Sequence, residues 1–254
     1  MSKKLTPIFG RVGSKRTLKH LIAEVMPEDY DLFVEPFIGG GAIFLNTSHL
    51  KGSVINDKDE ELISMWKLVQ KGMDGNREDY SSSDLDQLKE WYYADQTTDM
   101  GRLVKFILKS SNTFGSMGKG KLYKNADPYK KLKKLDVFKE KLTDTIITSG
   151  DYRTVMEKHD STTTFFYLDP PYSKAGVENG DNASKQLYKE SYFSVSELVI
   201  FLKTIKGKWL VSLEDTPRIR EMFKEYTFKT CTAGGTGNRD VGVNKRHELL
   251  IFNY

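Results

Sequence analysis

Hydrophobic and polar positions follow two periods along this chain, and stretches of one period alternate with stretches of the other. Short runs rich in β-branched and aromatic residues predict strands over 31–34, 53–56, 145–149, 162–167, 208–213, 226–232 and 248–254. Apolar residues at helical spacing predict helices over 14–26, 42–50, 60–71, 84–94, 101–110, 129–142, 194–206 and 217–223. Strands that alternate with helices in this way predict an α/β fold.

Composition and length fit one globular core with a smaller insertion. The chain has 254 residues, of which 38% are hydrophobic and 29% are charged. No apolar run approaches the length of a membrane span, and the first residues lack a signal-peptide core, so we expect an intracellular, cytoplasmic protein. The single cysteine, Cys231, cannot form an internal disulfide or a multi-cysteine metal site, and the four histidines show no ligand spacing. The sequence thus predicts neither a metal nor a membrane partner.

Positive charge is concentrated in one part of the chain. The formal net charge is only +4, yet residues 105–141 hold eleven lysines against three acidic residues. This segregation indicates a polyanion partner, although lysines on a solvated face would give the same pattern. We predict that 72–135 is an insertion and that 1–71 and 136–254 together form the main domain.

The stretch Asp169-Pro170-Pro171-Tyr172 follows the predicted strand 162–167, with only Leu168 between them. Open α/β sheets bind ligands at the carboxyl ends of their strands, which is where this acid falls. A carboxylate, a backbone carbonyl held by two stiff prolines and an aromatic face suit a planar substrate with an exocyclic amine. The two acceptors would localise the lone pair of the amine for attack. The alternative is that these four residues form only a turn.

A glycine-rich turn follows the predicted strand 31–34. Its candidate binding residues are Glu35, Pro36, Phe37, Gly39 and Gly41. Asp57 closes the next strand, at the distance where an acid holds the hydroxyls of a ribose. The dinucleotide pattern G-x-G-x-x-G requires glycine or alanine at position 44, where this chain has Phe44, and the charge of Glu35 would repel a pyrophosphate. The cationic cofactor S-adenosylmethionine therefore fits this turn better than NAD does.

Two further loops carry candidate binding residues. After the predicted strand 145–149, Asp151 could accept a hydrogen bond from an adenine amino group, and Tyr152 could flank the adenine ring. Near the start of the chain, Arg11 and Lys15 lie in a glycine-punctuated loop, which could equally be a simple helix cap. The polar stretch 173–185 after the Asp-Pro-Pro-Tyr motif has the length typical of a mobile lid.

These motifs in this order resemble the Dam-like DNA adenine methyltransferases. The resemblance rests on Arg11 to Lys15, Val34 to Gly41, Asn56-Asp57, Gly150 to Tyr152, Asp169 to Tyr172 and Arg246 to Leu250. It implies a seven-stranded, Rossmann-like, S-adenosylmethionine-dependent methyltransferase sheet with a mostly helical target-recognition insertion. It places Arg11, Lys15 and the glycine turn at the methionine end of the cofactor, Asp57 at the ribose, and Asp151 and Tyr152 at the adenine.

By the same resemblance, Asp169 adjoins both cofactor and target base. Two departures matter. Family members usually have an aromatic residue at the position of Arg11, and the insertion lacks the pattern of members that recognise GATC, which leaves the target sequence open.

The predicted function is site-specific transfer of a methyl group to the exocyclic amine of adenine in double-stranded DNA, in a bacterial or virus-infected cell. The residues predicted to contact DNA are Asn112, Thr113 and Ser116 at base edges and Lys119, Lys121 and Lys124 at phosphates. One alternative is methylation of RNA or of a protein glutamine, and another is a non-catalytic DNA-binding module of the same fold. Whether a cognate restriction endonuclease exists stays open.

Overall fold

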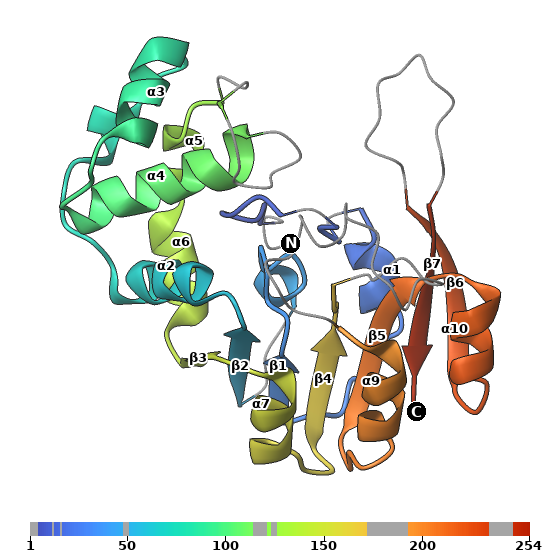
Figure 1. Cartoon of the computed structure of the whole chain (residues 1–254). Coiled ribbons are helices and arrows are strands. Elements are labelled where there is room, and N and C mark those ends of the chain that lie inside the picture. The colour runs from blue at the N-terminus through green and yellow to red at the C-terminus, as the bar shows by residue number, and fades with distance from the viewer. Residues whose placement is uncertain are drawn as a thin grey trace. The chain divides into compact units, whose positions relative to one another are not determined.

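The structure of the protein is a computed structural model, which describes residues 5–11, 13–15, 17–47, 51–113, 121–122, 126–171, 193–233 and 246–254. The strands are β1 (Leu32–Glu35), β2 (Gly52–Asp57), β3 (Thr145–Ser149), β4 (Thr164–Leu168), β5 (Lys208–Glu214), β6 (Thr227–Ala233) and β7 (Arg246–Phe252). Within the described residues they form a seven-stranded sheet in the order β3-β2-β1-β4-β5-β7-β6 (Figure 1). The predicted Rossmann-like α/β fold is confirmed.

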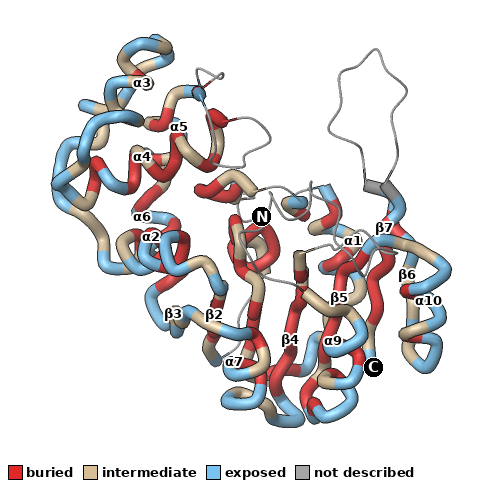
Figure 2. Tube along the Cα trace, viewed as in Figure 1, coloured by how far each residue is buried: buried red, intermediate tan, exposed pale blue. Residues whose placement is uncertain are grey.

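Parallel pairing dominates the centre of the sheet. β1 pairs in parallel with β2 and with β4, and β4 pairs in parallel with β5. β7 is antiparallel to both β5 and β6. All five residues of β4 are buried, as expected for a strand with a neighbour on each side and packed side chains on both faces (Figure 2).

The chain divides into two compact units, which we describe separately. The first, here called the sheet unit, comprises Thr17–Phe37, Ser48–Asn56 and Gly150–Tyr254. Its helices are α1 (Lys19–Ala23), α7 (Tyr152–Lys158), α9 (Val195–Leu202) and α10 (Pro217–Met222).

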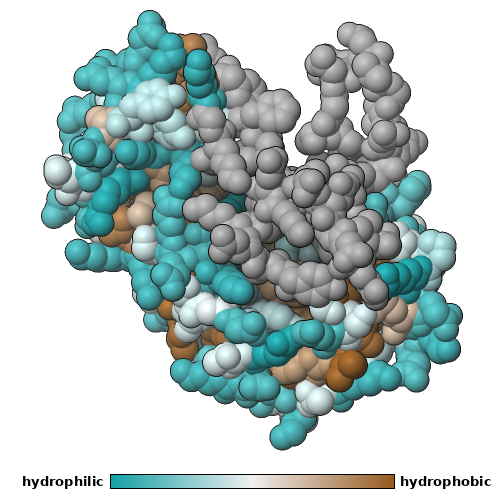
Figure 3. All heavy atoms as spheres, in the orientation of Figure 1, coloured by the Kyte–Doolittle hydropathy of each residue, from teal (hydrophilic) through white to brown (hydrophobic). Residues whose placement is uncertain are grey.

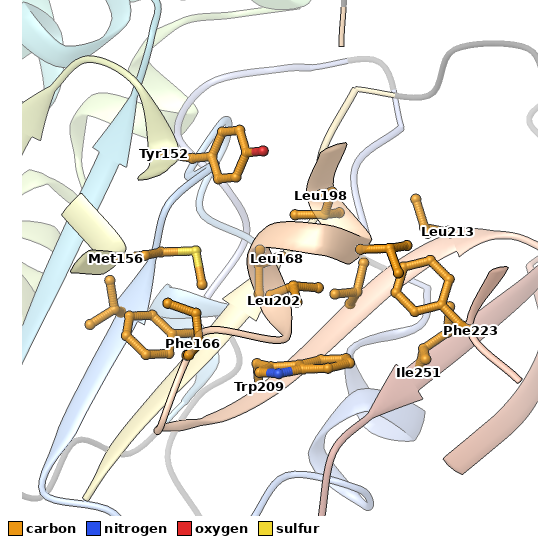
Figure 4. Packing of buried hydrophobic residues seen from close by; sticks show 14 of the residues in the cluster. Tyr152, Met156, Phe166, Leu168, Leu198, Leu202, Trp209, Leu213, Phe223 and Ile251 are labelled. Carbon is orange, nitrogen blue, oxygen red and sulfur yellow. The ribbon is translucent and has the colours of Figure 1, made fainter. Parts of the chain in front are cut away.

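One continuous apolar cluster holds the sheet unit together. Leu198 and Leu202 of α9 and Met156 of α7 join this cluster with Phe166 of β4 and Trp209 of β5 (Figure 4). All five side chains are essentially inaccessible to solvent. This packing fixes the central strands and therefore the loops that follow them.

The second unit, here called the helical unit, comprises Met1–Arg16, Ile38–Thr47 and Asp57–Ser149. Its elements are η1 (Phe44–Asn46), α2 (Glu60–Lys71), η2 (Arg77–Tyr80), α3 (Leu85–Tyr93), α4 (Asp99–Asn112), α5 (Tyr129–Leu132), α6 (Leu135–Leu142) and β3. The ring of Phe9 lies 5.1 Å, centroid to centroid, from both Trp66 of α2 and Phe106 of α4, edge to face in each case. A residue near the start of the chain thus anchors two helices of this unit.

Two predicted helices are much shorter than expected. The helix predicted over 14–26 is found only over Lys19–Ala23; in the loop before it, Gly13 takes a left-handed φ of +81° and the Nζ of Lys15 donates to the carbonyl of Gly13 at 3.0 Å. Lys15 therefore does not lie on a first helical turn. The helix predicted over 42–50 is only η1 in the described residues, and the side chain of Asn46 bonds to the Ala42 carbonyl in competition with the backbone.

Two other expectations about helices were also wrong. The basic helix predicted over 129–142 is broken into α5 and α6, and α7 was not predicted at all. The short 3₁₀ helix η2 was likewise not predicted, whereas the remaining helices and all seven strands lie within a few residues of their predicted positions.

Large apolar side chains are rare on the described surface. Those exposed are Tyr93, Val137, Ile146, Ile200 and Tyr254. Hydrophilic residues cover most of the described surface on the face seen in Figure 3. This is the normal pattern for a protein that folds around its own core.

Candidate functional site

The order of strands reverses between β1 and β4, and this point marks the centre of the candidate site in the sheet unit. Counted outwards from this point, the strands are β1, β2 and β3 on one side, and β4 and β5 come first on the other. In doubly wound sheets, ligands bind outside the carboxyl ends of the two strands at such a switch point. β1 ends at Glu35, and β4 ends one residue before Asp169. Two predicted acids thus lie at the ends of the two strands that flank the switch point.

The catalytic motif begins where the buried strand β4 ends. Leu168 is paired with Val211 of β5. Pairing between β4 and β5 therefore holds the backbone directly before Asp169. Asp169 is half-buried, Pro170 is buried and Pro171 is half-buried. Tyr172 lies outside the described residues, as does the predicted lid over 173–185.

The acid at the end of β1 is almost completely buried. Glu35 is only 2% exposed, and the Pro36 that follows is also buried. A carboxylate removed from water is costly unless it meets a cation or hydrogen-bond donors. A buried acid in this position is suited to a positively charged ligand and unsuited to a phosphate.

The loop after β3 forms the start of α7 instead of a free turn. Asp151 is exposed, and its carboxylate caps the helix by accepting from the backbone N–H of Arg153 at 2.9 Å. The ring of Tyr152 is buried against Phe37, with 5.2 Å between centroids. Its hydroxyl is buried and has no hydrogen-bond partner among the described residues. Burial raises the pKa of this hydroxyl, which therefore stays protonated.

Phe193 was missed at the sequence level. Its ring lies 5.7 Å from Phe37 and 5.8 Å from Tyr152, centroid to centroid, and completes an aromatic trio. Phe193 precedes the Ser194 cap of α9 by one residue. An aromatic residue directly before a helix cap was the only signal available for it.

In the helical unit, Asp57 is held by two backbone donors. Its Oδ2 accepts from the N–H of Gly39 and its Oδ1 from the N–H of Asp59, each at 3.0 Å. Burial raises the pKa of Asp57. The two backbone hydrogen bonds and the charge of Arg11 act to lower this pKa, but the effect of burial is larger. The carboxylate is thus fixed against the glycine turn, and its oxygens have further lone pairs for a ligand.

Arg11 is fixed by an acid that sequence reasoning missed. It forms an ion pair with Asp59, which also caps α2 by accepting from the N–H of Leu62 at 3.1 Å. Burial acts to raise the pKa of Asp59, but the charge and hydrogen bond of Arg11, the bond from the N–H of Leu62 and the charge of Lys109 together lower this pKa overall. The Nε of Arg11 is buried without a partner in the described part of the chain. The acidic run before α2 was the sequence signal for this cap.

The glycine turn is packed tightly in the helical unit. Gly39 and Gly41 have φ values of +46° and +70°. The indole Nε1 of Trp66 donates to the carbonyl of Gly39 at 3.2 Å. A Cβ at position 41 would lie 2.9 Å from the ring of Trp66, so glycine is required there by space as well as by conformation.

The residues predicted to contact DNA have different environments. Asn112 and Thr113 are buried, and their side chains donate to the carbonyls of Ala126 and Lys109 at 3.1 and 2.7 Å. Base contact by these two residues stays a prediction that would require these bonds to be exchanged. Lys121 is exposed, while the predicted contacts at positions 116, 119 and 124 lie outside the described residues.

The described residues hold no cluster of metal ligands and no membrane-spanning helix. In that part of the chain, no three His, Cys, Asp or Glu side chains are grouped as metal ligands would be. No helix among the residues described combines the length and the apolar character needed to span a bilayer.

Comparison with known proteins gives the family. Residues 12–233 match the D12 class N6 adenine-specific DNA methyltransferases. The Type II methyltransferase M.CviBI of Paramecium bursaria Chlorella virus NC1A is 26% identical over 98% of this chain and 100% of its own length. The Type II methyltransferase M1.LlaDCHI of Lactococcus lactis subsp. cremoris is 25% identical over 98% and 96%. The DNA adenine methylase of Haemophilus influenzae is 25% identical over 89% and 85%.

The match covers most of the chain, from the loop of Lys15 to the end of β6, and it includes the glycine turn and the Asp169 motif. It therefore decides for an enzyme that acts on DNA, against the RNA, protein-glutamine and non-catalytic alternatives. The family also implies S-adenosylmethionine as the methyl donor. The chain belongs to the D12 class N6 adenine-specific DNA methyltransferases.

Proposed function

We propose that this DNA adenine methyltransferase is site-specific and that Asp169 and Pro170 orient the target amine. The observation that carries this proposal is the position of Asp169, directly after a fully buried strand at the switch point of the sheet. A residue there is held rigidly, and rigid placement of reacting groups is the main source of rate in a transfer that needs no covalent enzyme intermediate.

The described residues fit a cofactor with a sulfonium, an ammonium and a carboxylate. When bound, S-adenosylmethionine supplies an electrophilic methyl group. In our proposal, Glu35 faces its cationic end, since the acid is buried and would repel a phosphate. Arg11 and the buried Lys15 bind its carboxylate, and the buried Nε of Arg11, which has no partner among the described residues, supports this assignment.

The remaining cofactor contacts follow from hydrogen bonding and stacking. In the proposal, Asp57 accepts from the ribose hydroxyls through lone pairs that Gly39 and Asp59 leave available. Asp151 accepts from the adenine amino group, and Tyr152 lies against the adenine ring. The backbone of the turn from Pro36 to Gly41 encloses the methionine part.

On the substrate side, the Asp169 carboxylate and the Pro170 carbonyl each accept one hydrogen of the adenine amine. This directs the lone pair of the nitrogen towards the methyl group. In the same proposal, Tyr172 stacks on the base, which must leave the DNA duplex to reach these groups. As the amine takes the methyl group it would lose one proton to solvent, and the sulfonium would leave as an uncharged thioether.

We propose that 72–135 acts as the target-recognition insertion. Support comes from the excess of lysines over acids in 105–141, most of which lies within this insertion and includes the exposed Lys121 and Lys130. Lys131 is not available for phosphates, because its Nζ donates to the Ile8 carbonyl and to the Ser111 hydroxyl at 2.5 and 2.6 Å. The proposal includes a cognate restriction endonuclease. Its support is that two relatives are named as Type II methyltransferases.

The test is transfer of tritiated methyl groups to double-stranded DNA by Asp169→Ala. We expect activity to be lost while the fold is retained. Asp160→Ala is the control, because Asp160 precedes the other end of β4, away from the switch point, where its carboxylate accepts from the backbone N–H groups of Lys206 and Gly207. Substantial methyl transfer by Asp169→Ala would refute the assignment. Sequencing of methylated sites would show whether transfer is site-specific.

A further inference from the structure

The side chain of Asn56 joins two loops of the sheet unit. Asn56 lies in β2 and is 2% exposed. Its Nδ2 donates to the carbonyl of Pro36 at 3.1 Å and to the carbonyl of Gly150 at 3.0 Å. An amide nitrogen carries two hydrogens, so both donors are committed. Because both partners are carbonyl oxygens, the orientation of the amide is unambiguous.

The two carbonyls belong to loops that carry different parts of the proposed cofactor site. Pro36 begins the turn after β1, and Gly150 precedes Asp151 after β3. β2 lies between β1 and β3 in the sheet, so a single side chain of β2 contacts the backbone that follows each neighbouring strand. Strand pairing fixes the strands themselves but not the irregular backbone beyond their ends. The amide of Asn56 extends that constraint into both loops.

We propose that Asn56 is a positioning residue, which sets the spacing between the loop that receives the methionine end of the cofactor and the loop that receives its adenine. The inference rests on the proposed function. It assigns no contact between Asn56 and the cofactor: the amide acts through the two backbone segments that it holds.

Two substitutions distinguish the loss of the two hydrogen bonds from their replacement by electrostatic repulsion. Asn56→Ala removes both donors and leaves the buried carbonyl of Pro36 and the half-buried carbonyl of Gly150 without this partner. Asn56→Asp keeps the shape of the side chain but places a carboxylate oxygen against the same two carbonyl oxygens. The carboxylate repels these carbonyls and therefore pushes both loops away from residue 56. The expected order of S-adenosylmethionine affinity is therefore wild type, then Asn56→Ala, then Asn56→Asp.

Asn253→Ala is the matched control. Asn253 also joins two backbone groups of the sheet unit: it donates to the carbonyl of Gly207 at 3.1 Å and accepts from the N–H of Trp209 at 2.8 Å. These groups lie at the start of β5, whereas Asn56 acts at the carboxyl ends of β1 and β3. The variant loses a comparable number of bonds away from the proposed cofactor loops.

The experiment measures the Kd of S-adenosylmethionine by titration calorimetry, the KM and kcat of methyl transfer, and the Tm of each variant. Loss of two hydrogen bonds should raise the Kd and KM for the cofactor by about tenfold in Asn56→Ala, and further in Asn56→Asp. The kcat at saturating cofactor and the KM for DNA should stay near wild type. A merely structural defect would instead lower kcat through a smaller folded fraction and leave KM unchanged.

Two different failures can be told apart. If the wild-type protein does not bind S-adenosylmethionine, the proposed function fails. If it binds, but the Asn56 variants keep wild-type affinity, or Asn253→Ala loses as much affinity at a similar Tm, the positioning role of Asn56 is overturned and the proposed function stands.

Discussion

Gly41→Ala tests how the glycine turn is built. Gly41 has a φ of +70°, and a Cβ there would lie 2.9 Å from Cζ2 and Cη2 of the fully buried Trp66. Left-handed backbone should cost alanine about 1–2 kcal/mol, and overpacking against the ring should add about 1–3 kcal/mol. We therefore expect the free energy of unfolding to fall by roughly 2–5 kcal/mol.

The control for this prediction is Gly13→Ala. Gly13 has a similar φ of +81°, but no heavy atom lies within 4 Å of its added Cβ. This variant should lose only the backbone contribution of about 1–2 kcal/mol. Urea unfolding of both variants isolates the packing contribution as the difference between them. Equal losses of stability would refute the claim that the ring of Trp66 fixes the turn.

Asp57→Ala should weaken S-adenosylmethionine binding by roughly 1.5–3 kcal/mol, because a charged acceptor is lost, and calorimetry with the cofactor and with NAD would check it. Burial, followed by the charge of Lys158, lowers the pKa of His159 from 6.5, so the unfolded state takes up a proton more readily. Stability should therefore fall as the pH drops from 6.5 through the lowered pKa, and His159→Gln should flatten this slope in urea unfolding across that range. Lys121→Gln should reduce the salt dependence of DNA binding by about one unit of slope, whereas Lys131→Gln should mainly lower the Tm.

The sequence predicted those parts of the fold that follow from local periodicity. β4 was identified from its run of β-branched and aromatic residues, and Asp169 does lie at its carboxyl end. The helix expected over 14–26 spans only Lys19–Ala23, and the loop before it holds a left-handed Gly13 and a bond from the Lys15 ammonium to the Gly13 carbonyl. Neither feature is visible in a hydrophobic pattern.

The candidate site was predictable as a set of loops but not as a network. The roles proposed for Asp57 and Asp151 came from their positions after strands. That Asp59 would pair with Arg11, or that Phe193 would pack on Tyr152, depends on chain segments about 40 residues or more apart. The burial of Asn112 and Thr113 was also invisible, because polar residues at the end of a helix are usually exposed.

The position of β7 has a consequence for how the chain folds. β7 follows β6 in the sequence but lies between β5 and β6 in the sheet. Among the described strands, β6 pairs with β7 alone, through seven register positions from Thr227 to Ala233. β6 can therefore join the sheet only together with β7, as a hairpin that docks on β5. Until that docking, β5 presents an unpaired edge that can recruit a strand from another molecule. The docking step thus competes with aggregation, and its rate sets how long the newly made chain is vulnerable.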